Sequence, residues 1–571
     1  MNENVTVKEY WEQIEFFSEM LIENAKDQFE KLNEILKHLD NLHPTAFEKL
    51  LSFLSSPKII EQPDDLKVNL WNTLINFTSK HKKFSNAKWA FKPEILAKID
   101  NVAKKLEPQN PLFLYARLFC GHDSDLYEEK GNWDEQRKKL DEHRQYAVKV
   151  ILDNGGIDAI LDFLHNIESP TNVGHALAAI SEDLIDEKIL PTLLDAEENY
   201  IRQFIYAYVS GKYYRNGWNW VDNMMQKPWS KVQISCFLTY LPFIQGTWDR
   251  VTKILSDSEN LYWAKTIVNP YHTNDDLTLA IDNLVKYGRP RAALDCINRL
   301  LFDKKPLDII RAITALKAAL SSKEPIYSMD SYHITEIIKA LQNDPSVNQD
   351  DLFFIEWAYL PLLDEHIGVK PKTLELRLSS NPEFFSEVIR LIYRSKNVTE
   401  TELKEPTENE KANATNAWDL LYKWQIIPGT QQNGTFDEER FVNWIDKMWT
   451  DCESTGHLEV ALSKIGQVLH YSPVDPSGFW INKTIAEFLN RKDTKEARNG
   501  FSSEVFNSRG FHWVDPTGRP ELELANTYRQ KAQVTENAGY QRFAITLKNI
   551  AEEYEMDSKR IIEEHNREMN E

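Results

Sequence analysis

Residues 287–301 read YGRPRAALDCINRLL, and this stretch marks the end of one helix and the start of the next. Gly288 can take the positive φ that closes a helix, and Pro290 stands where a first-turn proline needs no N–H partner. The apolar residues that follow recur at spacings of three and four and so share one helix face: Ala293, Leu294, Ile297, Leu300 and Leu301. Two helices joined by a tight corner cannot bury their apolar faces alone, so the stretch predicts stacked helix pairs.

The composition of the whole chain favours helices over strands. Hydrophobic residues make up 42% of the 571 residues, which is ample material for a packed interior. Only 19 residues are Gly, and alternating Val and Thr runs are almost absent, so the usual material of β-sheets is missing. Amphipathic segments bounded by Pro, Gly, Asn or Asp recur at the unit size of helical repeats, roughly every 30 to 40 residues. We therefore expect an all-α protein, an elongated superhelical array of degenerate helix pairs like a TPR or HEAT α-solenoid.

These patterns divide the chain into four parts. Residues 1–110 are expected to form an N-terminal helical region and residues 111–396 a central helical-repeat array. Residues 397–416 are polar, charged and without apolar periodicity, which predicts a linker or mobile loop. Residues 417–571 are expected to form a C-terminal helical-repeat region that ends in a capping helix.

Charge and cysteine content restrict the classes of partner and the compartment. The formal net charge is -21, which disfavours nucleic acid as a partner unless basic residues gather on one face. The four cysteines lie far apart and fit free thiols better than disulfides or zinc ligands. No apolar stretch approaches the roughly 18 residues of a transmembrane helix, and no basic signal-peptide start is present. We expect a cytoplasmic protein that does not bind membranes.

No motif for catalysis or for cofactor or metal binding was found in the sequence. It lacks H-E-x-x-H, C-x-x-C, an EF-hand loop, G-x-S-x-G, a kinase loop set and a Walker A motif. Gly155 and Gly156 lack the preceding strand and the Lys of a phosphate-binding loop, so they are expected to form a corner between two helices. We assign no catalytic, cofactor-binding or metal-binding residue and expect a non-enzymatic protein.

Two Arg–His pairs keep a second hypothesis open. HEPN-type ribonucleases carry an Arg and a His a few residues apart on a helical bundle, where both act on an RNA phosphate. Arg137 with His143 and Arg560 with His565 match this loose spacing, although chance should give on the order of two such matches. The alternative function is therefore a HEPN-like RNase or another nucleic-acid-acting toxin component.

An aromatic-rich stretch is the first candidate for partner binding. Its aromatic density suits a ligand cage or a protein hot spot, and it equally suits packing between neighbouring repeats. The residues selected as partner-binding are Tyr213, Tyr214, Trp218 and Trp220.

The loop 506–520 is the second candidate. It places polar donors beside a Trp among turn-forming residues, which suits an acidic group of a partner. The alternative is an ordered loop that folds back on the last helix pair. The residues selected here are Arg509, His512, Trp513 and Arg519.

Several stretches resemble the C-terminal region of large bacterial anti-phage defence proteins, in which a helical-repeat sensor region follows an effector or nucleotide-switch domain of the STAND or sirtuin type. The resemblance covers about residues 70–559 and includes GRPRAALD (288–295), NPEFF (381–385), WQIIPGT (424–430), IGQVLHYSPVDPSGFW (465–480) and FNSRGFHWVDPTG (506–518). It implies a sensor or scaffold without a cofactor that binds another protein, such as an effector subunit or a phage protein, or copies of itself. Because no effector motif precedes these stretches, we expect either the sensor part of a longer protein or a subunit with separately encoded partners.

Overall fold

The secondary structure of the chain is helical. The computed structural model describes residues 7–26, 28–127, 132–273, 276–364, 368–397, 405–431, 433–510 and 513–569. Within these ranges there is no strand, and one isolated antiparallel bridge joins Thr430 and Phe436. This confirms the all-α class predicted from the spacing of apolar residues.

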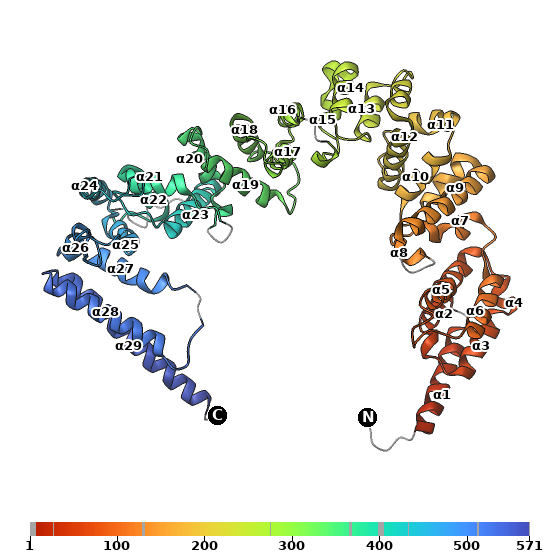
Figure 1. The fold of residues 1–571 in the computed structure, drawn as a ribbon, viewed down its shortest axis with the longest axis horizontal. Helices are drawn as coiled ribbons and strands as arrows, with labels where there is room; N and C mark the ends of the chain where they lie inside the picture. The colour runs from red at the N-terminus through yellow and green to blue at the C-terminus, as the bar shows by residue number, and fades with distance from the viewer. Residues whose placement is uncertain are drawn as a thin grey trace. The chain divides into compact units, whose positions relative to one another are not determined.

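The chain divides into two compact units, Met1–Asn283 and Leu284–Glu571. Figure 1 shows their helices, coloured from red at the N-terminus to blue at the C-terminus. The four-part division predicted from the sequence draws its boundaries elsewhere and stays a prediction. The helices of the first unit, with 3-10 helices marked η, are α1 Val7–Ala25, α2 Phe29–Leu36, η1 Leu39–Asn41, α3 Pro44–Leu54, α4 Pro57–Ile60, α5 Asp64–Lys83, α6 Pro93–Leu106, α7 Pro111–Leu114, η2 Ala116–Phe119, α8 Asp123–Leu126, α9 Trp133–Leu164, α10 Pro170–Ile180, α11 Asp183–Leu193, α12 Asn199–Met225, α13 Lys231–Thr239, α14 Gln245–Leu255, η3 Ser256–Ser258, α15 Asn260–Trp263 and η4 Pro270–His272.

Helix α16 (Thr278–Lys286) contains the boundary between the units. The helices of the second unit are α17 Pro290–Phe302, α18 Ile309–Ala319, α19 Asp330–Gln342, α20 Gln349–Ala358, η5 Leu360–Leu362, α21 Lys372–Ser380, α22 Pro382–Ile392, α23 Glu408–Lys423, α24 Glu438–Ser454, α25 Leu458–Leu469, α26 Lys483–Asn490, α27 Lys495–Asn507, α28 Arg519–Asn537 and α29 Gln541–Glu568.

The two glycine corners predicted from the sequence are confirmed. Gly288 has a φ of 82°, and Pro290 is the first residue of α17, whose residues Ala293, Leu294 and Ile297 are buried. Gly156 has a φ of 69° and interrupts α9, so the two arms of this helix run in different directions. A positive φ is accessible to glycine without a steric cost, which explains why both corners fall on this residue.

Helices that are two apart in the chain stack on each other within each unit, as helical repeats do. In the first unit, α10 packs against α12, and a Cβ added at Gly174 would lie 2.3 Å from the carbonyl oxygen of Phe204. In the second unit, α25 packs against α27, and a Cβ at Gly466 would lie 1.8 Å from the carbonyl oxygen of Ala497. Both distances are far below van der Waals contact, so the backbones approach this closely only because the residues are glycines.

Buried charged side chains connect consecutive helices in the second unit. Glu356 of α20 is fully buried, and its carboxylate accepts hydrogen bonds from the backbone N–H groups of Thr373 (2.9 Å) and Leu374 (3.0 Å) in the first turn of α21. A side-chain N–H of Gln342 in α19 donates to the same carboxylate at 2.7 Å. Burial raises the pKa of Glu356 to about 7, because removing the charge from water outweighs these hydrogen bonds.

A buried cation connects two consecutive helices, α26 and α27, further along the same unit. The guanidinium of Arg498 in α27 donates to the carbonyl oxygens of Leu489 and Arg491, each at 2.7 Å. These carbonyls end α26, where the last turn of a helix leaves oxygens without intrahelical partners. Arg498 therefore caps α26 from the neighbouring helix.

The polar linker or mobile loop predicted over residues 397–416 is helical from residue 408 onward, because residues 408–416 belong to α23. The helix begins at a capping box, in which the backbone N–H of Glu410 donates to the Thr407 hydroxyl and the Glu410 carboxylate accepts from the Thr407 N–H. Its later turns bury Ala417 and Leu420, so packing of the C-terminal half stabilises a polar N-terminal half that shows no apolar periodicity. Residues 398–404 lie outside the described residues.

Candidate binding sites

Three of the four selected aromatic residues of the first unit lie together on α12. The ring of Tyr213 contacts those of Tyr214 and Trp218, at centroid distances of 5.5 and 4.9 Å. The guanidinium of Arg250 lies 3.8 Å from the centroid of the Trp218 ring and is fixed by two hydrogen bonds to Asp222, of 2.8 and 2.9 Å. A cation of the same chain therefore occupies one face of Trp218, and the most exposed ring of the group is Tyr214.

Trp220 lies apart from this group, in the core of the unit. Its indole N–H donates to Asp186 at 2.8 Å, and the hydroxyl of Tyr208 donates to the same fully buried carboxylate. The ammonium of Lys212, also buried, lies 3.3 Å from Asp186 and donates to the carbonyl oxygen of Ser181 at 3.1 Å. Trp220 thus belongs to a buried ion pair and hydrogen-bond network that joins the end of α10, α11 and α12.

The selected residues of the loop 506–520 have different surroundings. Arg509 forms an ion pair of 2.9 Å with the buried Glu521, which fixes the start of the loop on α28. Trp513 is 91% exposed, and Arg519 is exposed and pairs with Glu523 at 2.9 Å on the same helix. His512 lies outside the described residues. The internal ion pair of Arg509 favours a structural role, whereas Trp513 and Arg519 can contact a partner.

A larger concave site is present in the first unit and was not selected from the sequence. We call it the unit-1 groove; it has a volume of about 720 Å³ and lies among α10, α11, α12, α13 and the segment after α15. It is lined by Thr171, Leu194, Asp195, Ala196, Glu197, Asn199, Arg202, Gln203, Tyr206, Val232, Cys236, Thr239, Tyr240, Lys265 and Ile267. Because these residues come from separate parts of the chain, no short motif indicates the groove.

The chemistry of the unit-1 groove is that of a binding surface. Val232 and Ile267 line it and remain 45% and 55% exposed. Burial raises the pKa of the Cys236 thiol and raises the pKa of Tyr240 to about 12, so both side chains are neutral near pH 7. Neutral and apolar residues are thus combined with lining residues of both charges, a composition that resembles a protein-binding site with a polar rim.

A smaller polar cavity of about 370 Å³ lies between α9, α10 and α12 in the same unit, and the selected residue Tyr214 lines it. Desolvation raises the pKa of Asp141 and lowers the pKa of His175, so that both side chains shift toward their neutral forms. Arg144 lines the cavity, but its guanidinium is already bonded to Asp123 and to the carbonyl oxygen of Leu118. This cavity can accept a small polar group.

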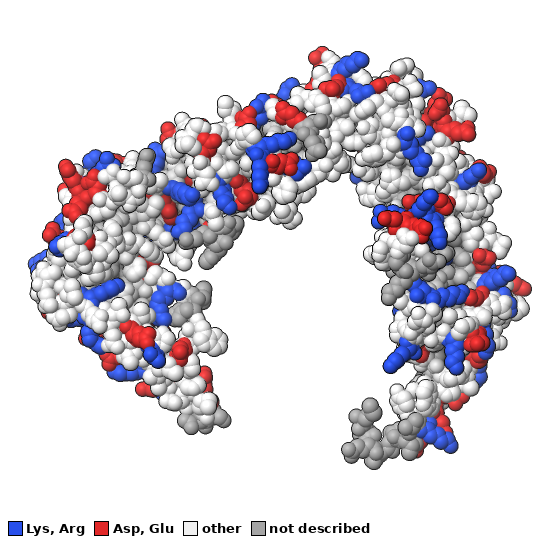
Figure 2. All heavy atoms as spheres, viewed as in Figure 1, with Lys and Arg blue, Asp and Glu red and all other residues white. Residues whose placement is uncertain are grey.

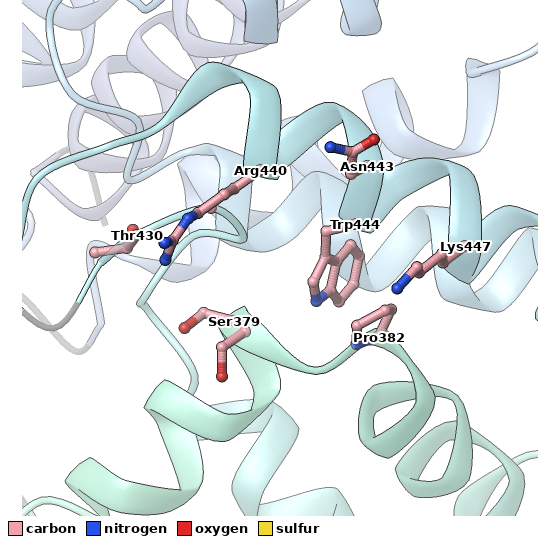
Figure 3. Close-up of a pocket in the computed structure, with 9 residues that line it drawn as sticks. Ser379, Pro382, Thr430, Arg440, Asn443, Trp444 and Lys447 are labelled. Atoms are coloured by element: carbon pink, nitrogen blue, oxygen red, sulfur yellow. The ribbon is translucent and has the colours of Figure 1, made fainter.

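The second unit has a pocket of about 280 Å³ beside α24 (Figure 3). Trp444 and Lys447 point from α24 toward Pro382, while Asn443 points away from it (Figure 3). The indole N–H of Trp444 donates to the carbonyl oxygen of Leu378 at 3.2 Å, and the hydroxyl of Ser379 donates to a backbone carbonyl of its own helix. The ionic groups that line this pocket are Arg440, which pairs with Asp437 at 3.5 Å, and Lys447. Two cations beside a pocket suit a carboxylate or a phosphate.

In neither Arg–His pair do the two side chains project from the same side of their helix. Six residues separate Arg137 from His143 on a continuous part of α9, which places them about 120° apart around the helix axis. Five residues separate Arg560 from His565 on α29, which places them about 140° apart. Arg560 also pairs with Asp557 at 2.8 Å. Neither pair lines a pocket described above, so no geometric observation favours the ribonuclease hypothesis.

Charged side chains of both signs are interspersed on the face of the molecule that Figure 2 shows. Among the described residues, no helix has the length and apolarity needed to cross a bilayer. The same residues contain no group of three or more His, Cys, Asp or Glu side chains placed to hold a metal ion.

The unit-1 groove is the largest of the pockets described here, and it combines exposed apolar side chains with charges of both signs. Its assignment as a binding site depends on its own geometry. Comparison of the chain with protein-family models, with curated proteins and with solved structures finds no match.

Proposed function

We propose that this chain is a helical-repeat scaffold or sensor that binds another protein through the unit-1 groove. The observation that carries the proposal is a groove of about 720 Å³ formed by successive helices of a repeat array. Stacked helical repeats expose extended surfaces of this kind, and their partners commonly insert an amphipathic segment into a groove.

The lining of the groove supports a protein partner over a small polar metabolite. Val232 and Ile267 expose apolar surface to water. A partner that covers this surface gains about 25 cal/mol of binding free energy per Å² buried. Arg202 and Lys265 lie with Asp195 and Glu197 along the same groove. Charges of both signs select the orientation of a partner more than they increase its affinity.

The biological setting of the proposal comes from the resemblance to anti-phage sensor regions. In that setting the partner is an effector subunit or a phage protein. The proposal predicts that a host carrying the intact chain with its natural neighbouring genes survives phage challenge better than one in which the groove is blocked.

Comparative capture with matched variants tests the proposal. The full chain, Val232→Glu, Ile267→Glu and the control Leu184→Glu are used as baits under identical conditions, and the captured proteins are quantified by mass spectrometry. Leu184 is 71% exposed on α11 and does not line the groove, so its substitution adds the same charge to a different surface of the unit. We expect a set of proteins that the chain and Leu184→Glu retain and that both groove variants lose by about tenfold or more, as substitution of central interface residues does.

Two outcomes would count against the proposal. Equal retention by all four baits would exclude the groove as the binding surface. Failure of the intact chain to retain any protein reproducibly, with its neighbouring genes co-expressed and with phage present, would contradict a scaffold or sensor function.

A further inference from the structure

The N-terminal helix α1 carries an apolar face that no described residue covers. Its inner side contacts α2 and α3 and buries Ser18, Ile22 and Ala25. Its outer side shows large hydrophobic side chains, of which the most exposed is Phe16 at 63%. The group on this side consists of Tyr10, Phe16, Phe17, Met20 and Leu21. Trp11 lies instead near the helical angle of Ile22, and its ring contacts that of His43 at a centroid distance of 5.8 Å.

Three members of this group form a continuous stripe. At about 100° per residue, Tyr10, Phe17 and Leu21 lie within roughly 40° of one another around the helix axis. Met20 and Phe16 extend the stripe on one side, and the rings of Phe16 and Phe17 are in contact at a centroid distance of 5.6 Å. A surface helix of a water-soluble array normally turns a polar face to solvent, so this apolar stripe is a candidate binding surface.

Carboxylates border the same side of the stripe. Helix α1 contains five Glu and one Lys. Lys8 pairs with Glu12 at 3.8 Å, and Lys26 and Lys49 pair with Glu23 and Glu19, so five carboxylates face three cations. By their helical spacing, Glu9 and Glu12 lie next to Phe16, along one side of the stripe. An excess of negative charge beside an apolar stripe is complementary to an amphipathic helix with basic flanks.

The charge also argues against two other occupants. A second copy of α1 would bring the carboxylates of both helices together, which is unfavourable. Anionic membranes attract basic amphipathic helices and repel acidic ones. We propose that the outer face of α1 binds one amphipathic helix of a partner protein, with its apolar stripe on Tyr10, Phe17 and Leu21 and its basic side chains beside Glu9 and Glu12.

This surface shares no residue with the unit-1 groove, so either proposal can fail while the other stands. The probe is a fluorescently labelled amphipathic peptide of about 18 residues, with a Leu stripe at helical spacing flanked by Lys and Arg. A second peptide has every Lys and Arg replaced by Glu. Fluorescence anisotropy measures binding of both peptides to the full chain, at about 50 mM and about 300 mM NaCl, since added salt screens exposed charges.

We expect the basic peptide to bind at least about tenfold more tightly than the acidic one, and less tightly at the higher salt. Phe17→Lys combined with Leu21→Lys should weaken its binding by about tenfold or more, whereas the control Leu184→Lys should leave binding unchanged. Because Phe17 and Leu21 are each 54% exposed, the variant should keep its helical circular dichroism.

A charge-reversed variant, Glu9→Lys with Glu12→Lys, tests the same proposal without touching the apolar stripe. It should narrow or invert the preference for the basic peptide. Equal binding of the two peptides, or no binding of either, would overturn the proposal. So would a dimer in analytical ultracentrifugation that Phe17→Lys with Leu21→Lys abolishes, or α1-dependent sedimentation with phosphatidylglycerol vesicles, because these would assign the face to a second copy or to a membrane.

Discussion

Two three-helix segments, α10–α11–α12 in the first unit and α25–α26–α27 in the second, have the same layout. In each, the first and third helices pack through glycines, with Gly174 and Gly211 in one segment and Gly466 and Gly500 in the other. The approach is closer in the second unit, where a Cβ at Gly500 would lie 1.9 Å from the carbonyl oxygen of Ser463. A Cβ at Gly211 would meet the Cβ of Ala178 at 2.8 Å.

The two segments attach their middle helix with opposite charges. Asp186, a buried anion on α11, accepts from side chains of α12 and pairs with Lys212. Arg498, a buried cation on α27, donates to the backbone carbonyls that end α26. The middle helix is therefore attached by a side-chain ion pair in the first unit and by a helix cap in the second. This difference explains how a repeated structure can have a sequence repeat too degenerate for a consensus.

The largest effect is expected from the ion pair. Asp186→Asn should lower the free energy of unfolding by about 3–5 kcal/mol, because the Lys212 ammonium is then buried without a counter-charge. Urea denaturation followed by tryptophan fluorescence measures the change, with the exposed Asp183→Asn on the same helix as the control. The double variant Asp186→Asn with Lys212→Met should be more stable than Asp186→Asn alone. Additive costs would show that the pair does not interact.

Replacing a glycine at a helix contact should cost more stability in the unit where the two helices lie closer together. Gly466→Ala forces two backbones apart and should cost about 3 kcal/mol, whereas Gly211→Ala meets a methyl group and should cost about 1 kcal/mol. Each value includes the roughly 1 kcal/mol by which Ala favours a helix over Gly. The measurement is again the shift in the urea midpoint, with Ser503→Ala on the exposed side of α27 as the reference. Equal costs at the two glycines would contradict the difference in packing.

Loss of the helix cap should have a smaller effect than loss of the ion pair. Arg498→Met leaves the carbonyl oxygen of Leu489 without this donor, while that of Arg491 keeps the Thr494 hydroxyl at 3.1 Å. The change should cost about 2 kcal/mol, less than Asp186→Asn because no charge is left unpaired. Arg498→Lys keeps a cation that can reach these carbonyls and should recover part of the loss. If Arg498→Met proved as costly as Asp186→Asn, the distinction between a cap and an ion pair would fail.

The helical class and the corners could be predicted from the sequence because they depend on local properties. The spacing of Ala293, Leu294 and Ile297 defines a helix face, and Gly288 with Pro290 defines its start. The close helix contacts were missed, since a glycine inside a helix usually indicates weakness. A usable signal was present, because Gly174 has Ala178 four residues later, and small residues at this spacing leave room for a second helix.

The candidate sites were predicted less well than the fold. Tyr213, Tyr214 and Trp218 meet because they are close on one helix, but the φ of 63° at Gly217 redirects the chain and sends Trp220 into the core. The unit-1 groove joins residues from 171 to 267, and only tertiary packing brings them together. No short sequence motif could therefore indicate the unit-1 groove.

The buried carboxyl of Glu356 has a consequence for how the second unit exchanges protons with solvent. Its pKa is about 7 in the folded chain against 4.5 for the unperturbed group, so between these pH values the folded state holds a proton that the unfolded state has lost. Stability from this residue is complete below pH 4.5 and decreases as the pH rises to about 7, by about 3 kcal/mol in total. Unfolding near pH 6 thus releases a proton to the buffer. The calorimetric enthalpy of unfolding should accordingly vary with the ionisation heat of the buffer, which makes the joint of α19, α20 and α21 a proton-coupled element of the array.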